Sequence, residues 1–179
     1  MKWLARIAGF YPQGTKSAAE RMLSHLRRIR LRISELHSRL FYRPLLNSVV
    51  TMSADELKLS PEAAKLQLAA LGYNHPNRAF EHLTSLAAGT SRKARIQAIL
   101  LPTLMEWLAD TADPDMGLLN YRKLSEAAND RSWFLRMLRD EGIVGQRLMH
   151  ILGTSPFTSD LIISAPDSVK QLSDGATGP

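Results

Sequence analysis

The sequence predicts an all-α protein, an irregular multi-helix bundle with a long N-terminal amphipathic helix. Hydrophobic residues make up 45% of its 179 residues, which is typical of a globular chain. Apolar side chains recur at helical spacing along most of the chain, and residues that cap or end helices stand between these segments. The β-branched runs at 47–52 and 160–164 are short and lie among helix signals, so they do not predict strands.

A long helix is predicted to begin after Ser17. The stretch SAAE, from Ser17 to Glu20, has the spacing of a capping box, in which each side chain bonds the other residue's backbone amide. Pro44 is expected to end or kink this helix, and SADE at 53–56 repeats the capping spacing. Apolar residues recur along the helix at alternating steps of four and three, with arginines on the other faces: Met22, Leu26, Ile29, Ile33, Leu36 and Leu40.

Shorter helices are predicted from there onward. Ser60 and Pro61 suit a helix start, and Gly72 suits a left-handed stop. The segment 75–89 repeats this arrangement with its own Pro and Gly. A longer buried helix with Pro102 inside it follows, and a kink is expected there. Further short helices are predicted over 113–130, 130–142, 144–155, 155–165 and 165–175.

The net charge of +6 is concentrated near the start of the chain. Residues 1–46 hold ten Lys and Arg and two Glu, whereas residues 47–179 hold 13 basic and 15 acidic residues. A basic segment of this kind is typical of contact with nucleic acid, an anionic surface or an acidic neighbouring domain. Arg21, Arg28 and Arg32 follow at steps of seven and four, close to one face of the long helix, and are therefore candidates for an interdomain or partner contact.

The sequence offers no candidate catalytic, cofactor-binding or metal-ligating residues. It has no cysteine, which excludes disulfides, thiolate zinc sites and cysteine nucleophiles. A His-Glu-x-x-His zinc motif, a Gly-Lys-Ser/Thr phosphate loop and a Gly-x-Ser-x-Gly elbow are all missing. The first residues lack the apolar core of a signal peptide, and no run of about 18 apolar residues exists, so we expect a cytoplasmic protein that does not bind a membrane.

One stretch, GTSPFTSDLIISAPD at 153–167, has a partial likeness to a nucleotidyltransferase metal motif. A Gly-Thr turn is followed by Asp160, but position 162 carries Ile instead of the second carboxylate that two-metal chemistry requires. Ser155 and Pro156 fit a helix start better than a catalytic turn. The sequence therefore predicts helix punctuation here, with Asp160 facing solvent or capping a helix, and with three apolar side chains buried: Phe157, Leu161 and Ile162.

Longer motifs carry a family resemblance. In order along the chain they are LHSRLFYRPLLNSV, LSPEAAKLQLAALGY, LTSLAAGTSRKARIQAILLPTLMEWLADTADPDMGLLNYRKLSEA, SWFLRMLRDEG and LGTSPFTSDLIISAPDSVKQL. Over about residues 10–173 the chain closely resembles the middle region of glutamine synthetase adenylyltransferase/adenylyl-removing enzymes, in their actinobacterial form.

The resemblance implies a fragment of a large cytoplasmic enzyme with two nucleotidyltransferase domains. One domain removes AMP from a tyrosine of glutamine synthetase by phosphorolysis, and the other attaches it from ATP with Mg²⁺. Helical segments between them are associated with regulation by the PII signalling protein and glutamine. The catalytic Gly-Ser…Asp-x-Asp motifs are missing from this chain, so no catalytic residue can be carried over, and we expect the fragment to need no cofactor and to be inactive alone.

The implied organisation has three parts. Residues 1–16 are expected to be the tail of a preceding nucleotidyltransferase domain or a disordered lead-in, 17–173 a helical linker or regulatory domain, and 174–179 a linker. Two alternatives to a regulatory role remain. One is a purely structural helical spacer, and the other is nucleic-acid binding through the Arg-rich helix, which no groove-reading motif accompanies.

Overall fold

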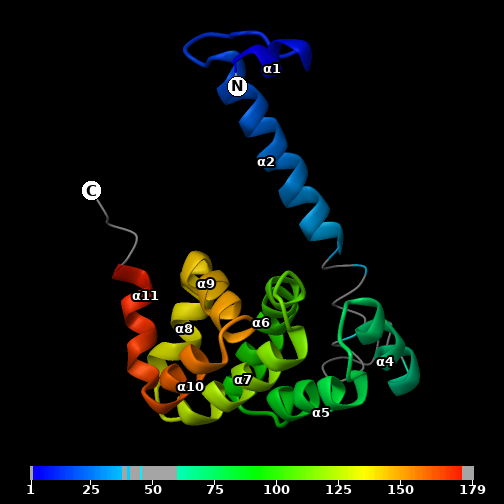
Figure 1. Ribbon diagram of the computed structural model, residues 1–179, viewed down its shortest axis with the longest axis vertical. Helices are drawn as coiled ribbons and strands as arrows, with labels where there is room; N and C mark the ends of the chain where they lie inside the picture. The colour runs from blue at the N-terminus through cyan, green and yellow to red at the C-terminus, as the bar shows by residue number, and fades with distance from the viewer. Residues whose placement is uncertain (1, 38–39, 41–44, 46–59, 175–179) are drawn as a thin grey trace. The chain divides into compact units, whose positions relative to one another are not determined.

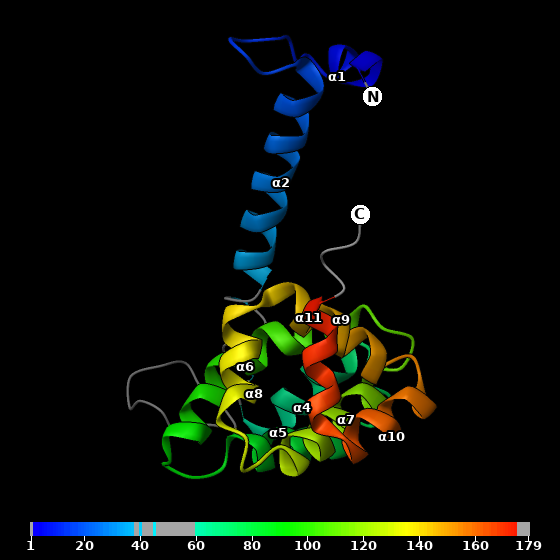
Figure 2. The same cartoon turned by 90° about the vertical axis from the view of Figure 1, so that its left-hand side faces the viewer.

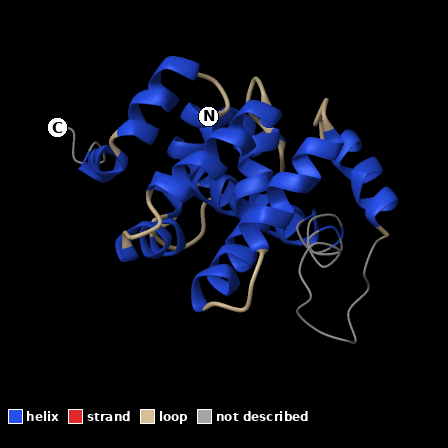
Figure 3. Ribbon diagram, turned by 90° about the horizontal axis from the view of Figure 1, so that it is seen from below, coloured by secondary structure: helices blue, strands red, loops and turns tan. Residues whose placement is uncertain are grey.

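The computed structural model describes residues 2–37, 40, 45 and 60–174 of the chain. Over these residues the regular elements are all helical, apart from one isolated β-bridge between Gln13 and Lys16 (Figure 1, Figure 3). The predicted all-α class is therefore confirmed. The chain divides into two compact units, residues 1–40 and residues 41–179.

The first unit consists of two helices, α1 (Lys2–Ile7) and α2 (Ala18–His37), which pack against each other. The predicted capping box opens α2, because Glu20 Oε2 accepts from the Ser17 amide at 2.7 Å and Ser17 Oγ accepts from the Glu20 amide at 3.3 Å. These hydrogen bonds hold the pKa of Glu20 below its usual range. The sequence expectations for Pro44 and for 53–56 fall outside the described residues, as does the β-branched run at 47–52.

The second unit is a helical bundle, which Figure 2 shows from a second side. The bounds of its helices are α4 (Pro61–Ala70), α5 (Pro76–Ala87), α6 (Arg92–Ala109), α7 (Pro114–Ala127), α8 (Ser132–Asp140), α9 (Gly142–Leu152), α10 (Pro156–Ser164), the short 3₁₀ helix η2 (Pro166–Lys170) and α11 (Gln171–Asp174). These helices follow one another closely along the chain, and most helices that are neighbours in sequence also pack against each other; α8 instead packs against α6 and α9.

Most of the predicted helix starts and stops of the bundle are confirmed. Two differ: α9 begins at Gly142, two residues before the predicted 144, and the helix predicted over 165–175 is divided into η2 and α11. Ser60 Oγ accepts from the Ala63 amide at 3.2 Å, and Pro61 occupies the first turn of α4. Gly72 after α4 and Gly89 after α5 adopt φ values of +97° and +95°, the left-handed conformation that a glycine tolerates without strain. Side-chain caps recur at Ser91, Asp113 and Ser155, which open α6, α7 and α10.

Helices α6 and α7 form the centre of the bundle, and each contacts several other helices. Pro102 lies inside α6 as predicted; its neighbour Leu101 is buried, whereas Thr103 is exposed. The buried core of these two helices consists mainly of Leu101, Leu104, Met105, Leu108, Leu118, Tyr121 and Leu124. Trp107 and Trp133 are partly buried and pack against this core. In the part of the chain that is described, no helix is long and apolar enough to cross a lipid bilayer.

The first unit buries far less apolar surface than the bundle. Trp3 lies between apolar and basic residues near the start of the chain and is 71% exposed, unlike the partly buried Trp107 and Trp133 of the bundle. The reason is the shortness of α1, which has six residues and buries only Ala5 against α2.

Candidate functional site

The three arginines predicted as a contact face lie on α2 but in different surroundings. Arg21 is partly buried, and its Nη1 donates to the backbone carbonyl of Tyr11 at 2.6 Å, so this guanidinium is bound within its own unit. Arg28 and Arg32 are exposed. The structure thus leaves Arg28 and Arg32 as the members of this set that are open to a partner.

The stretch at 153–167 is folded as the start of a helix. Ser155 Oγ accepts from the Thr158 amide at 3.4 Å, and Pro156 follows in the first turn of α10. Asp160 is exposed, as predicted. Ser164 Oγ donates to the backbone carbonyl of Asp160 at 2.8 Å, so this hydrogen bond involves the backbone of Asp160 and not its carboxylate.

The burial expected along α10 is only partly confirmed. Ile162 is buried, but Phe157 is 74% exposed and Leu161 is 54% exposed, so the expectation was wrong for both. The helix turns Ser159 and Ile162 to the bundle instead. Ser159 Oγ is fully satisfied there, since it donates to the carbonyls of Ser155 at 2.7 Å and Ile151 at 3.3 Å. Phe157 and Leu161 are four residues apart and share the opposite face.

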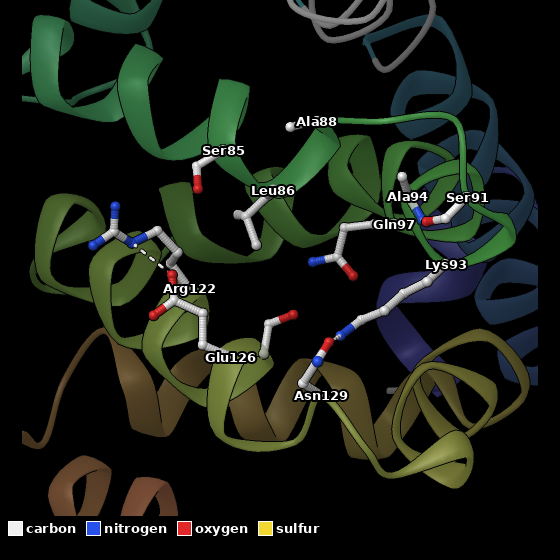
Figure 4. A pocket seen from close by; sticks show the side chains of 11 residues that line it. Ser85, Leu86, Ala88, Ser91, Lys93, Ala94, Gln97, Arg122, Glu126 and Asn129 are labelled. Atoms are coloured by element: carbon white, nitrogen blue, oxygen red, sulfur yellow. Dashed lines mark hydrogen bonds and ion pairs between the residues drawn. The ribbon is translucent and has the colours of Figure 1, made fainter.

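The bundle contains a polar cavity of about 430 Å³ between α5, α6 and α7. Side chains from three separate parts of the chain line it (Figure 4). They are Ser85, Leu86 and Ala88 at the end of α5, Ser91, Lys93, Ala94 and Gln97 at the start of α6, and Arg122, Ser125, Glu126 and Asn129 at the end of α7.

Gln97 and Ser125 are buried polar residues of this cavity, and Gln97 has only 2% of its surface exposed. Its Nε2 donates to Tyr121 Oη at 2.8 Å, and Tyr121 lies in the core of α7. Its Oε1 is buried and has no hydrogen-bond partner among the residues that the structure describes. Figure 4 shows the Gln97 amide directed into the cavity, so water or a bound molecule is the available partner for this acceptor.

Two charged contacts flank Gln97. Lys93 Nζ donates to Asn129 Oδ1, which joins the start of α6 to the end of α7. Burial lowers the pKa of Lys93 from its usual value. On the other side, Arg122 Nε lies 3.5 Å from Glu126 Oε1, an ion pair within α7. The arrangement can bind a small polar molecule, but the carboxylate of Glu126 is engaged by Arg122 and is poorly placed to act as a base.

None of these cavity residues was predicted from the sequence. Each stands within or at the end of a helix and belongs to no motif, and only the packing of three helices brings them together. One signal was available in Gln97, a polar residue on the apolar face of α6 between Ala94 and Leu101. Within the described ranges, no group of three or more His, Asp or Glu side chains is arranged to hold a metal ion.

Comparison with known proteins identifies relatives over the full length of the chain. The chain is 73% identical, over all of its residues, to a bifunctional glutamine synthetase adenylyltransferase/adenylyl-removing enzyme of Corynebacterium efficiens. The proteins of the same name from Corynebacterium glutamicum and Nocardia farcinica are 70% and 55% identical over the whole chain. No protein-family model matches the chain, and no solved structure matches it.

These relatives are much longer than this chain. The chain spans 17% of the length of the two Corynebacterium proteins and 18% of the Nocardia protein. The resemblance predicted from the sequence motifs is confirmed by identities of this size. From end to end, the chain corresponds to a segment of the bifunctional glutamine synthetase adenylyltransferase/adenylyl-removing enzymes of actinobacteria.

Proposed function

We propose that the chain is a non-catalytic regulatory or linker segment of an enzyme that adenylylates and deadenylylates glutamine synthetase, and thereby controls nitrogen assimilation. The proposal rests on the identity of 70–73% to proteins of that name, over a segment that is 17% of their length. A chain this similar in sequence has the same fold as the matching segment of its relatives, and we infer that it is part of an enzyme of the same kind.

The fold of the stretch at 153–167 supports a non-catalytic role. Two-metal nucleotidyl transfer needs at least two carboxylates that converge on the ions. Here Ser155 caps α10, Pro156 fills its first turn, and Asp160 stands exposed with Ile162 buried two residues later. A helical Asp-x-Ile segment turns these two side chains to different sides, so the geometry suits helix formation and not metal binding.

The cofactors and partners of the parent enzyme follow from the family name and the resemblance. ATP and Mg²⁺ would bind in nucleotidyltransferase domains that flank this segment, and this segment itself would hold no cofactor. Glutamine synthetase would be the substrate, and the PII signalling protein would be the regulatory partner. We place the enzyme in the cytoplasm, where glutamine synthetase and ATP are available.

A helical bundle between two catalytic domains can regulate them by fixing their mutual arrangement. Regulation requires that an effector bind two arrangements with different affinity, and that the segment favour one of them. The bundle provides a packed hydrophobic core, and α2 provides exposed cations at Arg28 and Arg32 for an acidic neighbouring surface.

The absence of catalysis is tested with residues 1–179 alone. The chain is incubated with glutamine synthetase, Mg²⁺ and ATP labelled in the α-phosphate, beside the full-length enzyme as positive control. We expect no labelled AMP on glutamine synthetase from the chain. Incorporation above the level of a heat-denatured sample would show that these residues contain a catalytic centre.

The contact role of α2 is tested in the full-length enzyme. Reversing two exposed charges, Arg28→Glu with Arg32→Glu, should change its rates at low salt, where screening of such contacts is weakest. The matched control reverses two exposed arginines of the bundle, Arg95→Glu with Arg136→Glu. Equal rates in both variants would mean that Arg28 and Arg32 are merely solvated.

A regulatory segment differs from a spacer in its response to PII. Titrating residues 1–179 with unmodified and modified PII, by calorimetry, should reveal binding that depends on the modification. The segment is a spacer if neither form of PII binds residues 1–179 and if PII still regulates a full-length enzyme in which these residues have been replaced.

A further inference from the structure

The first unit leaves its large apolar side chains uncovered. Among the described residues of this unit, the buried hydrophobic ones are Ala5 and Ala18. More than 40% of the surface is exposed in Trp3, Leu4, Ile7, Tyr11, Leu26, Ile29, Ile33, Leu36 and Leu40. Most of the stability of a helix in a protein comes from tertiary packing of its apolar face, and the short α1 leaves most of the apolar side chains of α2 exposed, so α2 has room for a further packing partner.

The exposed side chains of α2 form a narrow seam. Leu26, Ile29, Ile33 and Leu36 alternate at steps of three and four, and their exposed fractions lie between 41% and 61%. This spacing places Leu26 and Ile33 at the a positions of a heptad, with Ile29 and Leu36 at the d positions. A stripe confined to a and d is the pattern of a helix that packs along one other helix, whereas a membrane-surface helix carries a broader apolar face.

Basic side chains border the seam. In the same register Arg30 occupies an e position and Arg32 a g position, and both are exposed. The acidic residues of the helix, Glu20 and Glu35, fall at b and c positions away from the seam. The e and g positions are those that face the flanks of a partner helix and decide which partner is accepted.

We propose that this seam, formed by Leu26, Ile29, Ile33 and Leu36 of α2, packs against an amphipathic helix with Leu, Ile or Val at its a and d positions and Glu or Asp at its e and g positions. We assign that helix to another part of the longer polypeptide, since the chain spans only 17% of the relatives it matches. This assignment of the source rests on the proposed function, but the chemistry of the partner does not.

A second copy of the chain fits this surface poorly. A parallel pair brings g positions of one helix against e positions of the other, and an antiparallel pair brings g against g and e against e. With Arg30 at e and Arg32 at g, and with no acidic residue at any e or g position of α2, neither orientation gives these arginines an acidic partner. An acidic partner converts the same positions into attractive pairs.

The chemistry is tested with two synthetic probes. Both are 28-residue helical peptides with Ile at a and Leu at d, and they differ only in having Glu or Lys at every e and g position. Fluorescence anisotropy with residues 1–179 should show binding of the Glu peptide, weakened by added salt, and no comparable binding of the Lys peptide. Equal binding of both peptides, or of neither, would overturn the proposal.

Point substitutions show whether the seam is the surface that binds. Ile33→Asp should abolish binding of the Glu peptide, whereas Ile99→Asp on the exposed face of α6 should leave it unchanged. Arg30→Glu should weaken it about three- to tenfold, because one flanking attraction becomes a repulsion. Arg27→Glu makes the same charge change at a b position and should have a smaller effect. If Arg27→Glu and Arg30→Glu weaken binding equally, binding depends on the net charge of the helix and not on the e position, which would contradict the proposed arrangement.

The source of the helix is tested in the full-length polypeptide. A photocrosslinking residue, p-benzoylphenylalanine, replaces Ile29, and the crosslinked peptides are identified by mass spectrometry. We expect a crosslink within one polypeptide, to an acidic amphipathic segment outside residues 1–179. A crosslink between two copies, to residues 41–179, to glutamine synthetase or to anionic phospholipid vesicles would each overturn this assignment. The readout is independent of catalysis, so it can fail while the proposed function stands.

Discussion

Gly117 marks the closest approach between helices in the bundle. It lies on α7, opposite the end of α9, and a Cβ atom at this position would lie 2.5 Å from Leu108 Cδ2 and 3.0 Å from Gly153 Cα. Leu108 is fully buried in the core and has no space to move into. The backbone at Gly153 is also held, because its carbonyl accepts from the Asp113 amide at 2.9 Å. Gly117→Ala therefore forces either the core or the turn after α9 to shift.

The size of the effect follows from two opposed contributions. Overpacking by a single methyl group in a tight interior costs roughly 1–3 kcal/mol, and the backbone contact with Gly153 favours the upper half of that range. Alanine regains about 1 kcal/mol because it is a better helix former than glycine. We therefore expect Gly117→Ala to lower the free energy of unfolding by about 1–2 kcal/mol, which for a domain of this size lowers the Tm by about 2–8 °C.

The assay is urea unfolding followed by circular dichroism, with Gly142→Ala as the matched control. Gly142 is also helical, at the start of α9, but a Cβ atom there would meet nothing within 4 Å. The urea concentration at the unfolding midpoint of Gly142→Ala should equal that of the unsubstituted protein or be slightly higher. If Gly117→Ala is as stable as Gly142→Ala, the result would contradict the close packing of α7 against the end of α9 at Gly117.

Three further predictions concern single side chains of the bundle. Asp115 of α7 accepts from the Asn74 amide at 2.6 Å and the His75 amide at 3.1 Å, just before α5, so Asp115→Ala should lower the free energy of unfolding. Because Asp115 is partly exposed, we expect about 1–2 kcal/mol by urea unfolding, and no change would refute this capping role. Burial lowers the pKa of His82, so protonation favours the unfolded state, and stability present at neutral pH should decline as the pH falls below about 6.5; thermal melts should show a shallower decline in His82→Gln. Asp160→Ala and Phe157→Ala should each change the free energy of unfolding by about 1 kcal/mol or less, since both side chains are exposed; a loss of 3 kcal/mol or more for Phe157→Ala, as expected for a core site, would contradict the orientation of α10.

The helix boundaries could be predicted because short-range chemistry determines them. Ser60 followed by Pro61, and Gly72 eleven residues after Pro61, each act through their own turn of the backbone. The capping box at Ser17 is likewise formed between residues three apart. These capping and stop signals do not depend on what the helix packs against, so the helix boundaries can be predicted from the local sequence alone.

The buried face of α10 could not be predicted for the opposite reason. Apolar residues stand at Phe157, Leu161, Ile162 and Ile163, which lie on more than one side of the helix and indicate no single buried face. Burial was decided by α7 and α9, against which α10 packs, and they accept the small Ser159 beside Ile162. The bulky Phe157 was then left on the outside.

The polar cavity is a tertiary feature of the same kind. Gln97 and Tyr121 are 24 residues apart, and their hydrogen bond joins α6 to α7. Lys93 and Asn129 meet only because the same two helices pack together. The sequence spacing does not predict which residues of α6 and α7 form these pairs. A glutamine on an apolar helix face does indicate that a buried polar partner is needed.

Replacement of the bundle in the full-length enzyme tests the regulatory role most directly. Residues 60–174 are exchanged for an unrelated helical bundle that spans the same distance, and AMP transfer to glutamine synthetase and phosphorolysis from it are measured with and without PII. The account predicts that both chemical activities persist while PII no longer shifts the ratio of their rates. An unchanged response to PII would show that the segment is only a spacer, and the complete loss of either activity would show that it contributes to catalysis.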